Sequence, residues 1–405
     1  MSDIYFGTST SLNRVSFLRS DSKFVSSLIS GTGTTRLTFY VQGDKNDVAP
    51  VLVDTEGKSK LLVVELASLP AHLIAVLEQW AERNDQSSVD VREEITAVFL
   101  GLDETGAERP HLFSSNPLDS QLRVFGNSAK GITRHRYNGY EGVAYLAVDI
   151  TRSQQLKDYL FAGSASDGAK AYPGHSMMSI LGFEYNEAAL FGYGKTYLDW
   201  LMRNQRCPGC GSVVIPQDAG TRLYCTSGPD QSCPVKRTSV NNVCFPRSDP
   251  VVIIGVVSAD GSKTLLGHNR RHAADPVTGV RMFSTIAGFM EPGETIEEAS
   301  IREIWEETGC KASAVKIINS QPWPFPASLM IGCVAEVEFN GVNEVINIEH
   351  DKEMEEVKWI DTALIKDITE SEDLTGKDGT EAEKIRLPFR QSIAYSLISK
   401  IAHGE

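Results

Sequence analysis

Three glutamates in one short segment are the residues best suited to chemistry. Glu303, Glu306 and Glu307 recur at helical spacing, so they project from one side of a helix. Like charges at these spacings repel one another, so such a helix loses stability unless something positive lies among them. Carboxylate oxygens select hard cations such as Mg²⁺ or Mn²⁺, and Mg²⁺ characteristically bridges protein carboxylates to substrate phosphates. The cluster therefore predicts phosphate chemistry that depends on a divalent cation.

A helix must position these carboxylates, and the residues around them predict how it is held. Ile301, Ile304 and Trp305 share its opposite side, where we expect them to anchor the helix in an apolar core. Gly309 is placed to end the helix as a left-handed cap. Arg302 is expected to pair with the carboxylates and to fix their orientation. A solvated surface helix is the alternative interpretation of such an acidic run.

The pattern from Gly288 to Cys310 resembles the box of the Nudix hydrolase superfamily. Glu294 follows the first glycine by six residues, and an Arg-Glu pair, a hydrophobic residue, the paired glutamates and a final glycine then follow at the spacing of that box. The resemblance implies an α/β/α sandwich built on a mixed sheet, and hydrolysis of a nucleoside diphosphate linked to another moiety. It also implies that the three glutamates bind the catalytic metal ions. Which glutamate is the general base stays open.

A segment rich in proline and aromatic residues follows the box. Its alternating prolines remove backbone donors and exclude an ordinary central strand, and the stiff scaffold displays rings that suit stacking on a planar base. A packed turn is the structural alternative. The segment Ser320–Ser328 is similar to the signature of the NADH pyrophosphatases, a Nudix family, which implies that its residues line the dinucleotide site. These residues are Gln321, Pro322, Trp323, Pro324, Phe325, Pro326, Ala327 and Ser328.

The same resemblance assigns four further positions. Phe289, directly after the first glycine of the box, and Phe245, before the catalytic domain, are candidates for ring stacking, with a structural phenylalanine as the competing interpretation. Glu353 precedes a tryptophan by six residues, which is the family's spacing for a further metal ligand. Ala394 matches a position whose backbone meets the substrate.

Four of the seven cysteines fall within one short segment and predict a structural metal site. Cys207 and Cys210 form a knuckle, and Cys225 with Cys233 completes a set of four thiolates, which closes the coordination shell of a tetrahedral Zn²⁺. Cys244 is the alternative fourth ligand. NADH pyrophosphatases resemble this chain in carrying such a zinc ribbon, and the longer second spacing is similar to that of the fungal members.

The chain divides into four predicted parts. We expect an N-terminal α+β domain of the NADH pyrophosphatase type, itself Nudix-like, over 1–185, a connector helix over 186–206, a zinc ribbon over 207–240 and a catalytic Nudix domain over 241–405. Within the last part we expect a polar loop over 369–384 and a final helix over 389–401. The fold class is thus α+β, with an α/β/α sandwich as the catalytic part.

Composition limits the partners. With 39 basic and 53 acidic side chains, the net charge of -14 excludes broad attraction to nucleic acid or anionic lipid, although the stretch 201–250 carries six basic residues against three aspartates. The longest apolar runs, such as 251–257, are far shorter than the roughly 20 residues that cross a bilayer, so no membrane partner is expected. Without a secretory signal we expect an intracellular protein. A cytoplasmic location is favoured, and a peroxisomal one stays open although the chain lacks a Ser-Lys-Leu-type ending.

The resemblance predicts the reaction. We expect Mg²⁺- or Mn²⁺-dependent cleavage of the pyrophosphate of NADH, and of NAD, to nicotinamide mononucleotide and AMP, in a homodimer. Removal of NAD caps from RNA is the alternative activity within the same chemistry. A zinc-ribbon protein that binds RNA and carries an inert box is the alternative from a different class.

Overall fold

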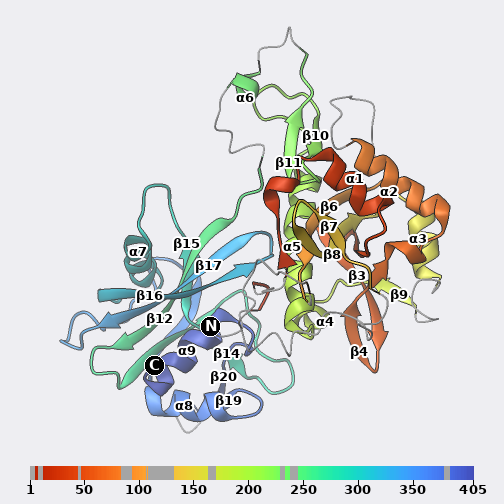
Figure 1. Cartoon of the computed structure of the whole chain (residues 1–405). Helices are drawn as coiled ribbons and strands as arrows, with labels where there is room; N and C mark the ends of the chain where they lie inside the picture. Colours follow the sequence, from red (N-terminus) through yellow and green to blue (C-terminus); the bar gives the residue numbers. More distant parts are fainter. Residues whose placement is uncertain are drawn as a thin grey trace. The chain divides into compact units, whose positions relative to one another are not determined.

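The structure is a computed structural model, and its contacts divide the chain into two compact units (Figure 1). It describes residues 5–7, 12–43, 47–83, 94–105, 107, 132–162, 170–228, 233–237, 245–377 and 384–405. The N-terminal unit comprises Phe6–Arg247 with Pro324–Pro326, and the C-terminal unit comprises Met1–Tyr5, Ser248–Trp323 and Ala327–Glu405. Among the helices of the described residues, none combines the length and the apolar character that crossing a bilayer needs.

The N-terminal unit is built on a mixed β-sheet in the order β1-β6-β8-β2-β3-β4, to which β5, β7 and β9 add at β2, β8 and β3. Its central strands β2 and β8 run parallel, whereas β6 and β8 are antiparallel. The strands are β1 Leu12–Asn13, β2 Thr35–Gln42, β3 Val48–Thr55, β4 Lys58–Leu61, β5 Val63–Glu65, β6 Thr96–Asp103, β7 His135–Tyr137, β8 Tyr140–Asp149 and β9 Ala171–Pro173.

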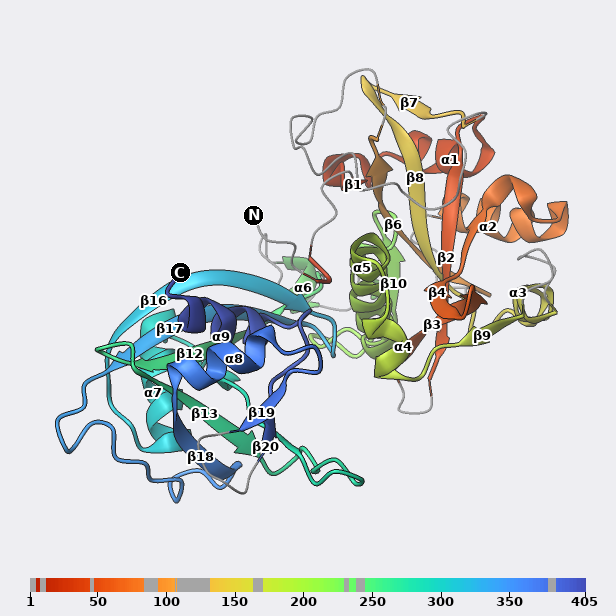
Figure 2. The ribbon, with the colours of Figure 1, turned by 90° about the horizontal axis from the view of Figure 1, so that it is seen from below.

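Helices cover both faces of this sheet, because side chains alternate along its strands. On one face, Phe24 of α1 packs against Phe99 in a core that α2 shares. On the other face α5 lies so close that a Cβ on Gly194 would come within 2.5 Å of the Tyr40 hydroxyl, and Figure 2 shows α2 and α5 on opposite sides. The helices are α1 Ser22–Ser30, α2 Ala71–Arg83, α3 Gln154–Phe161, α4 Met177–Leu181 and α5 Tyr185–Arg203, with short 3₁₀ turns at Ser16–Leu18 and Leu66–Ser68.

The cysteine segment belongs to the same unit and forms an antiparallel hairpin. Strands β10 (Val214–Gln217) and β11 (Arg222–Cys225) pair, and the short helix α6 (Pro234–Arg237) follows. The turn between the strands rests on β6, because the Ala219 carbonyl accepts a hydrogen bond of 3.0 Å from the Phe99 amide. Gly220 permits this approach, since a Cβ there would lie 2.2 Å from a backbone oxygen of β6.

The C-terminal unit is an α/β/α sandwich on a mixed sheet, as the sequence predicts. Its strands follow the order β16-β17-β12-β13-β18, with β15 beside β12, and β12 runs parallel to β17. Ile254 of β12 packs with Ile304 of α7 on one face, while Ile253 packs with Leu397 of α9 on the other (Figures 1 and 2). The strands are β12 Asp249–Ser258, β13 Lys263–Asn269, β15 Ile286–Phe289, β16 Ala312–Trp323, β17 Ser328–Val337 and β18 Met354–Asp361. The helices are α7 Ile296–Thr308, α8 Thr362–Glu370 and α9 Ile393–His403.

Two predictions for the end of the chain are wrong in part. The expected loop over 369–384 contains the end of α8 and strand β19 (Thr375–Lys377), which pairs with β20 (Lys384–Arg386) and, through it, with β14 (Arg281–Met282). Most of the described residues of these strands are polar, with Leu374 and Ile385 among the buried apolar side chains, so the hydrophobic pattern does not predict the strands. The final helix begins at Ile393 instead of Phe389, since Ser392 accepts a hydrogen bond from the Tyr395 amide and caps it.

Two glycine caps offer a matched test of the packing that ends α7. Gly309 and Gly404 both have positive φ, 74° and 71°, but a Cβ on Gly309 would lie 2.7 Å from Asn347 Cβ, whereas a Cβ on Gly404 would meet nothing within 4 Å. We expect Gly309→Ala to lower the free energy of unfolding by about 2–4 kcal/mol and Gly404→Ala by about 1 kcal/mol. Denaturant unfolding of the two variants measures the difference. Equal losses would show that the contact with Asn347 relaxes freely.

Candidate active site and cysteine cluster

Helix α7 is fixed at both ends by local contacts. At its start, the Thr295 side chain accepts a hydrogen bond from the Glu298 amide, and the Glu298 carboxylate accepts one of 2.8 Å from the Thr295 amide. This reciprocal capping box satisfies two amides that have no partner within the helix. At its end, Gly309 adopts the predicted left-handed conformation. The rotation of the helix about its axis is therefore well defined.

The side of α7 that faces the sheet differs from the prediction. Glu303 and Glu307 are 8% and 3% exposed, whereas Ile301 and Trp305 are 42% and 43% exposed, so the expected apolar anchor is wrong except for Ile304. The reason is the space that Gly288 leaves on β15. A Cβ at that position would lie 2.0–2.1 Å from the carboxylate atoms of Glu303, so only glycine leaves room for this acid to turn inward.

Arg302 orients the acids through its whole guanidinium group, as predicted. Its Nε and Nη2 donate to Glu294 at 2.6 and 2.9 Å, and its Nη1 donates to Glu303 at 2.8 Å and to Glu306 at 2.9 Å. A fifth hydrogen bond of 2.9 Å reaches the Phe289 carbonyl. The hydrogen bonds from Arg302 lower the pKa of Glu294 to about 2, so that carboxylate stays ionised.

Glu307 is the acid that this arginine does not reach. Its Oε2 atom is buried without a hydrogen-bond partner among the described residues. Burial raises the pKa of Glu307 to about 9, and the charges of Glu303 and Glu353 contribute to the same effect. A buried carboxylate oxygen without a partner is costly, and a hard cation is the group that would satisfy it.

Glu353 directly precedes β18, and its charge is among the causes that raise the pKa of Glu307. Its carboxylate accepts hydrogen bonds from Arg271 Nη2 at 2.7 Å and from Asn269 Nδ2 at 3.3 Å. Both donors lie more than 80 positions earlier in the chain, and the sequence analysis missed them. Pairing of β13 with β18 brings them to Glu353, and the basic run Arg270–His272 was the signal available in the sequence.

The donor set suits a divalent cation. Glu303, Glu306, Glu307 and Glu353 supply only oxygen ligands, one of them the buried oxygen that has no partner. Their carboxylates are not drawn into a tight cluster, because within the described part of the chain only the four cysteines bring three or more possible ligand atoms within 4.8 Å of one another. The acids therefore offer oxygen ligands without forming a closed site.

The predicted substrate residues of the C-terminal unit fall into two groups. Phe289 is 61% exposed at the end of β15 and can present its ring to a ligand. Gln321 is buried, and its amide is fully engaged: it donates to the carbonyls of Tyr5 and Gln391 at 3.0 and 2.9 Å and accepts from the Ile393 amide at 2.8 Å. Gln321 thus fixes the start of α9, where Ala394 is buried.

The Pro/aromatic segment forms the end of an edge strand and a turn. Pro322 lies within β16 at the edge of the sheet, where a missing donor is tolerated. The Trp323 ring stacks on Phe389 with centroids 6.2 Å apart. Pro322 and Pro326 are exposed, Ala327 is half-buried, and Pro324 and Ser328 are buried.

Phe325 and Phe245 belong to the N-terminal unit. Phe325 packs with Phe6 and Phe191, at centroid distances of 5.9 and 6.1 Å, so its ring has structural neighbours there. Phe245 is 50% exposed and is free to present its ring.

The four cysteines form a compact thiol cluster. The Sγ atoms of Cys207 and Cys233 are 3.6 Å apart, those of Cys210 and Cys225 are 3.5 Å apart, and all four lie within 4.8 Å of one another. Tetrahedral Zn–S bonds of about 2.3 Å place neighbouring sulfurs about 3.8 Å apart, which is close to these distances. The cluster can hold a metal ion with Cys233 as its fourth member. Cys244 lies outside the described residues.

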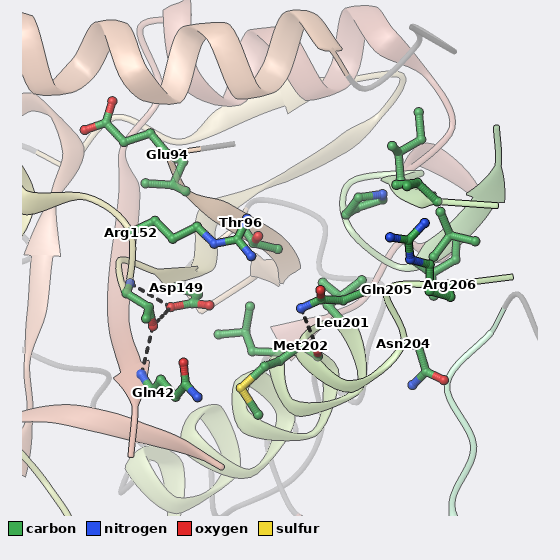
Figure 3. Close-up of a pocket in the computed structure, with 18 residues that line it drawn as sticks. Gln42, Glu94, Thr96, Asp149, Arg152, Leu201, Met202, Asn204, Gln205 and Arg206 are labelled. Atoms are coloured by element: carbon green, nitrogen blue, oxygen red, sulfur yellow. Dashed lines mark hydrogen bonds between the residues drawn. The ribbon is translucent and has the colours of Figure 1, made fainter. Parts of the chain in front are cut away.

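A separate pocket of about 240 Å³ lies in the N-terminal unit (Figure 3). Side chains at the ends of the central strands, such as Asp149, meet the last turn of α5 and the β10 strand there. It contains none of the residues that the sequence predicts for the dinucleotide site, so those residues and this pocket are distinct features.

Glu307→Gln is expected to stabilise the protein at pH 8 when divalent ions are absent. Glutamate ordinarily titrates near 4.5, whereas folded Glu307 holds its proton to about 9, so its stabilising contribution is complete below pH 4.5 and is lost as pH rises to about 9. The free energy of unfolding of the original chain should therefore fall through this window more steeply than that of the variant. Denaturant unfolding at pH 5.5 and pH 8 measures it, with the exposed Glu336→Gln as control. Identical pH dependence in all three proteins would contradict the burial argument.

Comparison with known proteins places this site in a family. Residues 247–375 match the Nudix domain family. The chain is 35% identical, over 97% of its length, to the NAD-capped RNA hydrolase NPY1 of Saccharomyces cerevisiae, of which 94% is covered. It is 28% identical, over 99% of its length, to the NAD-capped RNA hydrolase of Schizosaccharomyces pombe, of which 93% is covered. The human NAD-capped RNA hydrolase NUDT12 is 36% identical over 68% of this chain and 52% of that protein.

The match to the budding-yeast protein extends over nearly all of both chains, and the box glutamates Glu303, Glu306 and Glu307 lie on α7 within the matched Nudix domain. This chain is an enzyme that belongs to the NAD-capped RNA hydrolase family of the Nudix hydrolases.

Proposed function

We propose that this enzyme hydrolyses the pyrophosphate of NADH and NAD, with nicotinamide mononucleotide, reduced or oxidised, and AMP as products. The observation that carries the proposal is the buried, unpartnered oxygen of Glu307 beside two acids that Arg302 holds. Such an arrangement is costly in an inert protein, and it is the kind of strained polar site that function requires.

Glu303, Glu306, Glu307 and Glu353 would hold the divalent ion, and oxygen-only ligands favour Mg²⁺ or Mn²⁺. When bound, the ion neutralises the phosphates, lowers the pKa of water and stabilises the charge that develops on the leaving group. Arg302, on the same helix, keeps Glu303 and Glu306 in position by donating a hydrogen bond to each carboxylate. A glutamate of the box would accept the proton of the attacking water, because carboxylates are the bases that this site offers.

The substrate's rings would be bound by exposed aromatics. Phe289 is exposed and directly follows Gly288, against which the Glu303 carboxylate lies. It is therefore the best-placed candidate for stacking on nicotinamide or adenine. Trp323 and the backbone around Ala394 are further candidates of the same unit for this dinucleotide site, with Gln321, Pro322, Ala327 and Ser328. Phe245 and Pro324–Pro326, which belong to the other unit, stay predictions from the resemblance. In this proposal the Gln321 side chain acts by holding the backbone at the start of α9.

Removal of NAD caps from RNA is the second candidate activity. Relatives that match this chain over 94% and 93% of their length are NAD-capped RNA hydrolases. Both substrates contain the same anhydride, so one set of acids would serve for both. A homodimer and an intracellular location remain part of the proposal.

Glu306→Gln is expected to lower kcat for NADH at least about a hundredfold, because one charged ligand is lost while the shape of the side chain is kept. The assay is incubation with NADH, NAD, ADP-ribose or NAD-capped RNA and Mg²⁺, followed by separation of the nucleotides. Glu336→Gln is the control, and thermal unfolding shows that both variants are folded. Full activity of Glu306→Gln would remove the metal assignment, and strong RNA binding without hydrolysis in the original chain would favour an inert box.

The cysteine cluster is proposed to bind one structural Zn²⁺ per chain, since four thiolates leave no open position for catalysis. Elemental analysis should find one zinc ion per chain, and Cys233→Ser should lower that content and the thermal stability of the protein. Cys244→Ser should retain the ion. Loss of zinc in Cys244→Ser alone would make Cys244 the fourth ligand, and the absence of zinc in the original chain would overturn the assignment.

A further inference from the structure

Glu353 is held by three consecutive residues at the end of β13. The Arg270 amide donates to its carbonyl at 3.0 Å, Asn269 Nδ2 donates to Oε2 at 3.3 Å, and Arg271 Nη2 donates to Oε1 at 2.7 Å. Arg270 thus holds the backbone of Glu353, while the carboxylate has one neutral donor, Asn269, and one charged donor, Arg271. Arg271 is the cation that balances the proposed fourth metal ligand.

This ion pair competes with a divalent cation. In the proposed function Glu353 and Glu307, the buried acid without a partner among the described residues, share one divalent ion, so this ion would take an oxygen of the Glu353 carboxylate. An oxygen that accepts a hydrogen bond from a guanidinium at 2.7 Å cannot bind a metal ion along the same direction. Binding of the ion to Oε1 along that direction would displace Arg271.

The backbone of Arg271 is held by hydrogen bonds, whereas its side chain is exposed. Its amide donates to Asn269 Oδ1 at 2.9 Å, and the neighbouring Arg270 side chain donates to the Met354 carbonyl at 3.1 Å, so the turn stays attached to β18. The Arg271 side chain itself is 74% exposed. Its guanidinium can therefore move without unfolding the turn. Arg302 cannot do the same, because its five hydrogen bonds fix it within the helix.

We propose that Arg271 is an exchangeable positioning residue: it holds Glu353 until a divalent ion takes that carboxylate, and it then binds a phosphate oxygen of the dinucleotide. The inference rests on the proposed function for its second half. For a displaced guanidinium the phosphate oxygens of the substrate would be charged acceptors, and arginine suits them because its planar group carries paired donors. The same residue thus opposes the ion and favours the substrate.

Arg271→Ala should therefore change two affinities in opposite directions. Mn²⁺ should bind the variant about twofold to fivefold more tightly in the absence of substrate, because the ion no longer has to break the exposed ion pair between Arg271 and Glu353. The KM for NADH at saturating Mg²⁺ should rise about tenfold, with kcat nearly unchanged, because a charged hydrogen bond to phosphate is lost. The metal arm is an electron paramagnetic resonance titration with Mn²⁺, and the substrate arm is steady-state kinetics on the full chain.

Arg281→Ala is the matched control, because Arg281 pairs with Glu356 in the same unit and its removal also deletes one positive charge. It should change neither affinity more than about twofold. Arg271→Lys, which retains the charge, should restore part of the KM. Weaker Mn²⁺ binding in Arg271→Ala, or equal effects of Arg271→Ala and Arg281→Ala, would overturn the exchange.

The two arms separate this inference from the proposed function. If the original chain hydrolyses none of the dinucleotides, the proposed function and the phosphate contact both fail, while the Mn²⁺ titration still decides whether Arg271 competes with the ion. If hydrolysis is normal and Mn²⁺ affinity does not rise in the variant, the exchange alone is wrong.

Discussion

The C-terminal unit depends on a charge imbalance that one arginine cannot remove. Arg302 donates to three carboxylates and one carbonyl, yet it carries a single positive charge. Glu307 stays buried beyond its reach, with an oxygen that has no partner among the described residues. The capping box of α7, the glycine on β15 that makes room for Glu303 and the apolar layer under Ile304 all serve to hold this imbalance in place. Stability is thereby exchanged for an affinity for cations.

Local patterns predicted the acidic helix but not the direction in which it faces. Helical spacing fixes the angles between Glu303, Glu306 and Glu307, and it also fixes their relation to Ile301 and Trp305. The choice of the buried side then followed the usual rule that apolar residues lie inside. Here a glycine on another strand reverses that choice, and single-sequence periodicity contains no information about which strand will lie beneath a helix.

Contacts between distant parts of the chain limited the rest of the prediction. The mixed sheet with helices on both faces is what the resemblance to the Nudix superfamily implies, and this prediction is confirmed. Asn269 and Arg271 were not, because strand pairing alone brings them to Glu353. The four cysteines of the cluster were predicted, but their spacing alone left Cys244 open as an alternative to Cys233, and the fold is what brings Cys233 to Cys207.

Tyr5 belongs to the C-terminal unit although it lies at the other end of the sequence. It is 1% exposed, and its carbonyl accepts a hydrogen bond from the buried amide of Gln321, the residue that also fixes the start of α9. A fragment that starts at Ser248 would therefore contain every box glutamate but would lack the Tyr5 carbonyl, which accepts a hydrogen bond from the buried Gln321 side chain. Separating the catalytic part by cutting the chain once, between the units, would expose Gln321 to water and loosen the final helix. The hydrolase unit is discontinuous in sequence, so it has to be prepared with its first residues supplied.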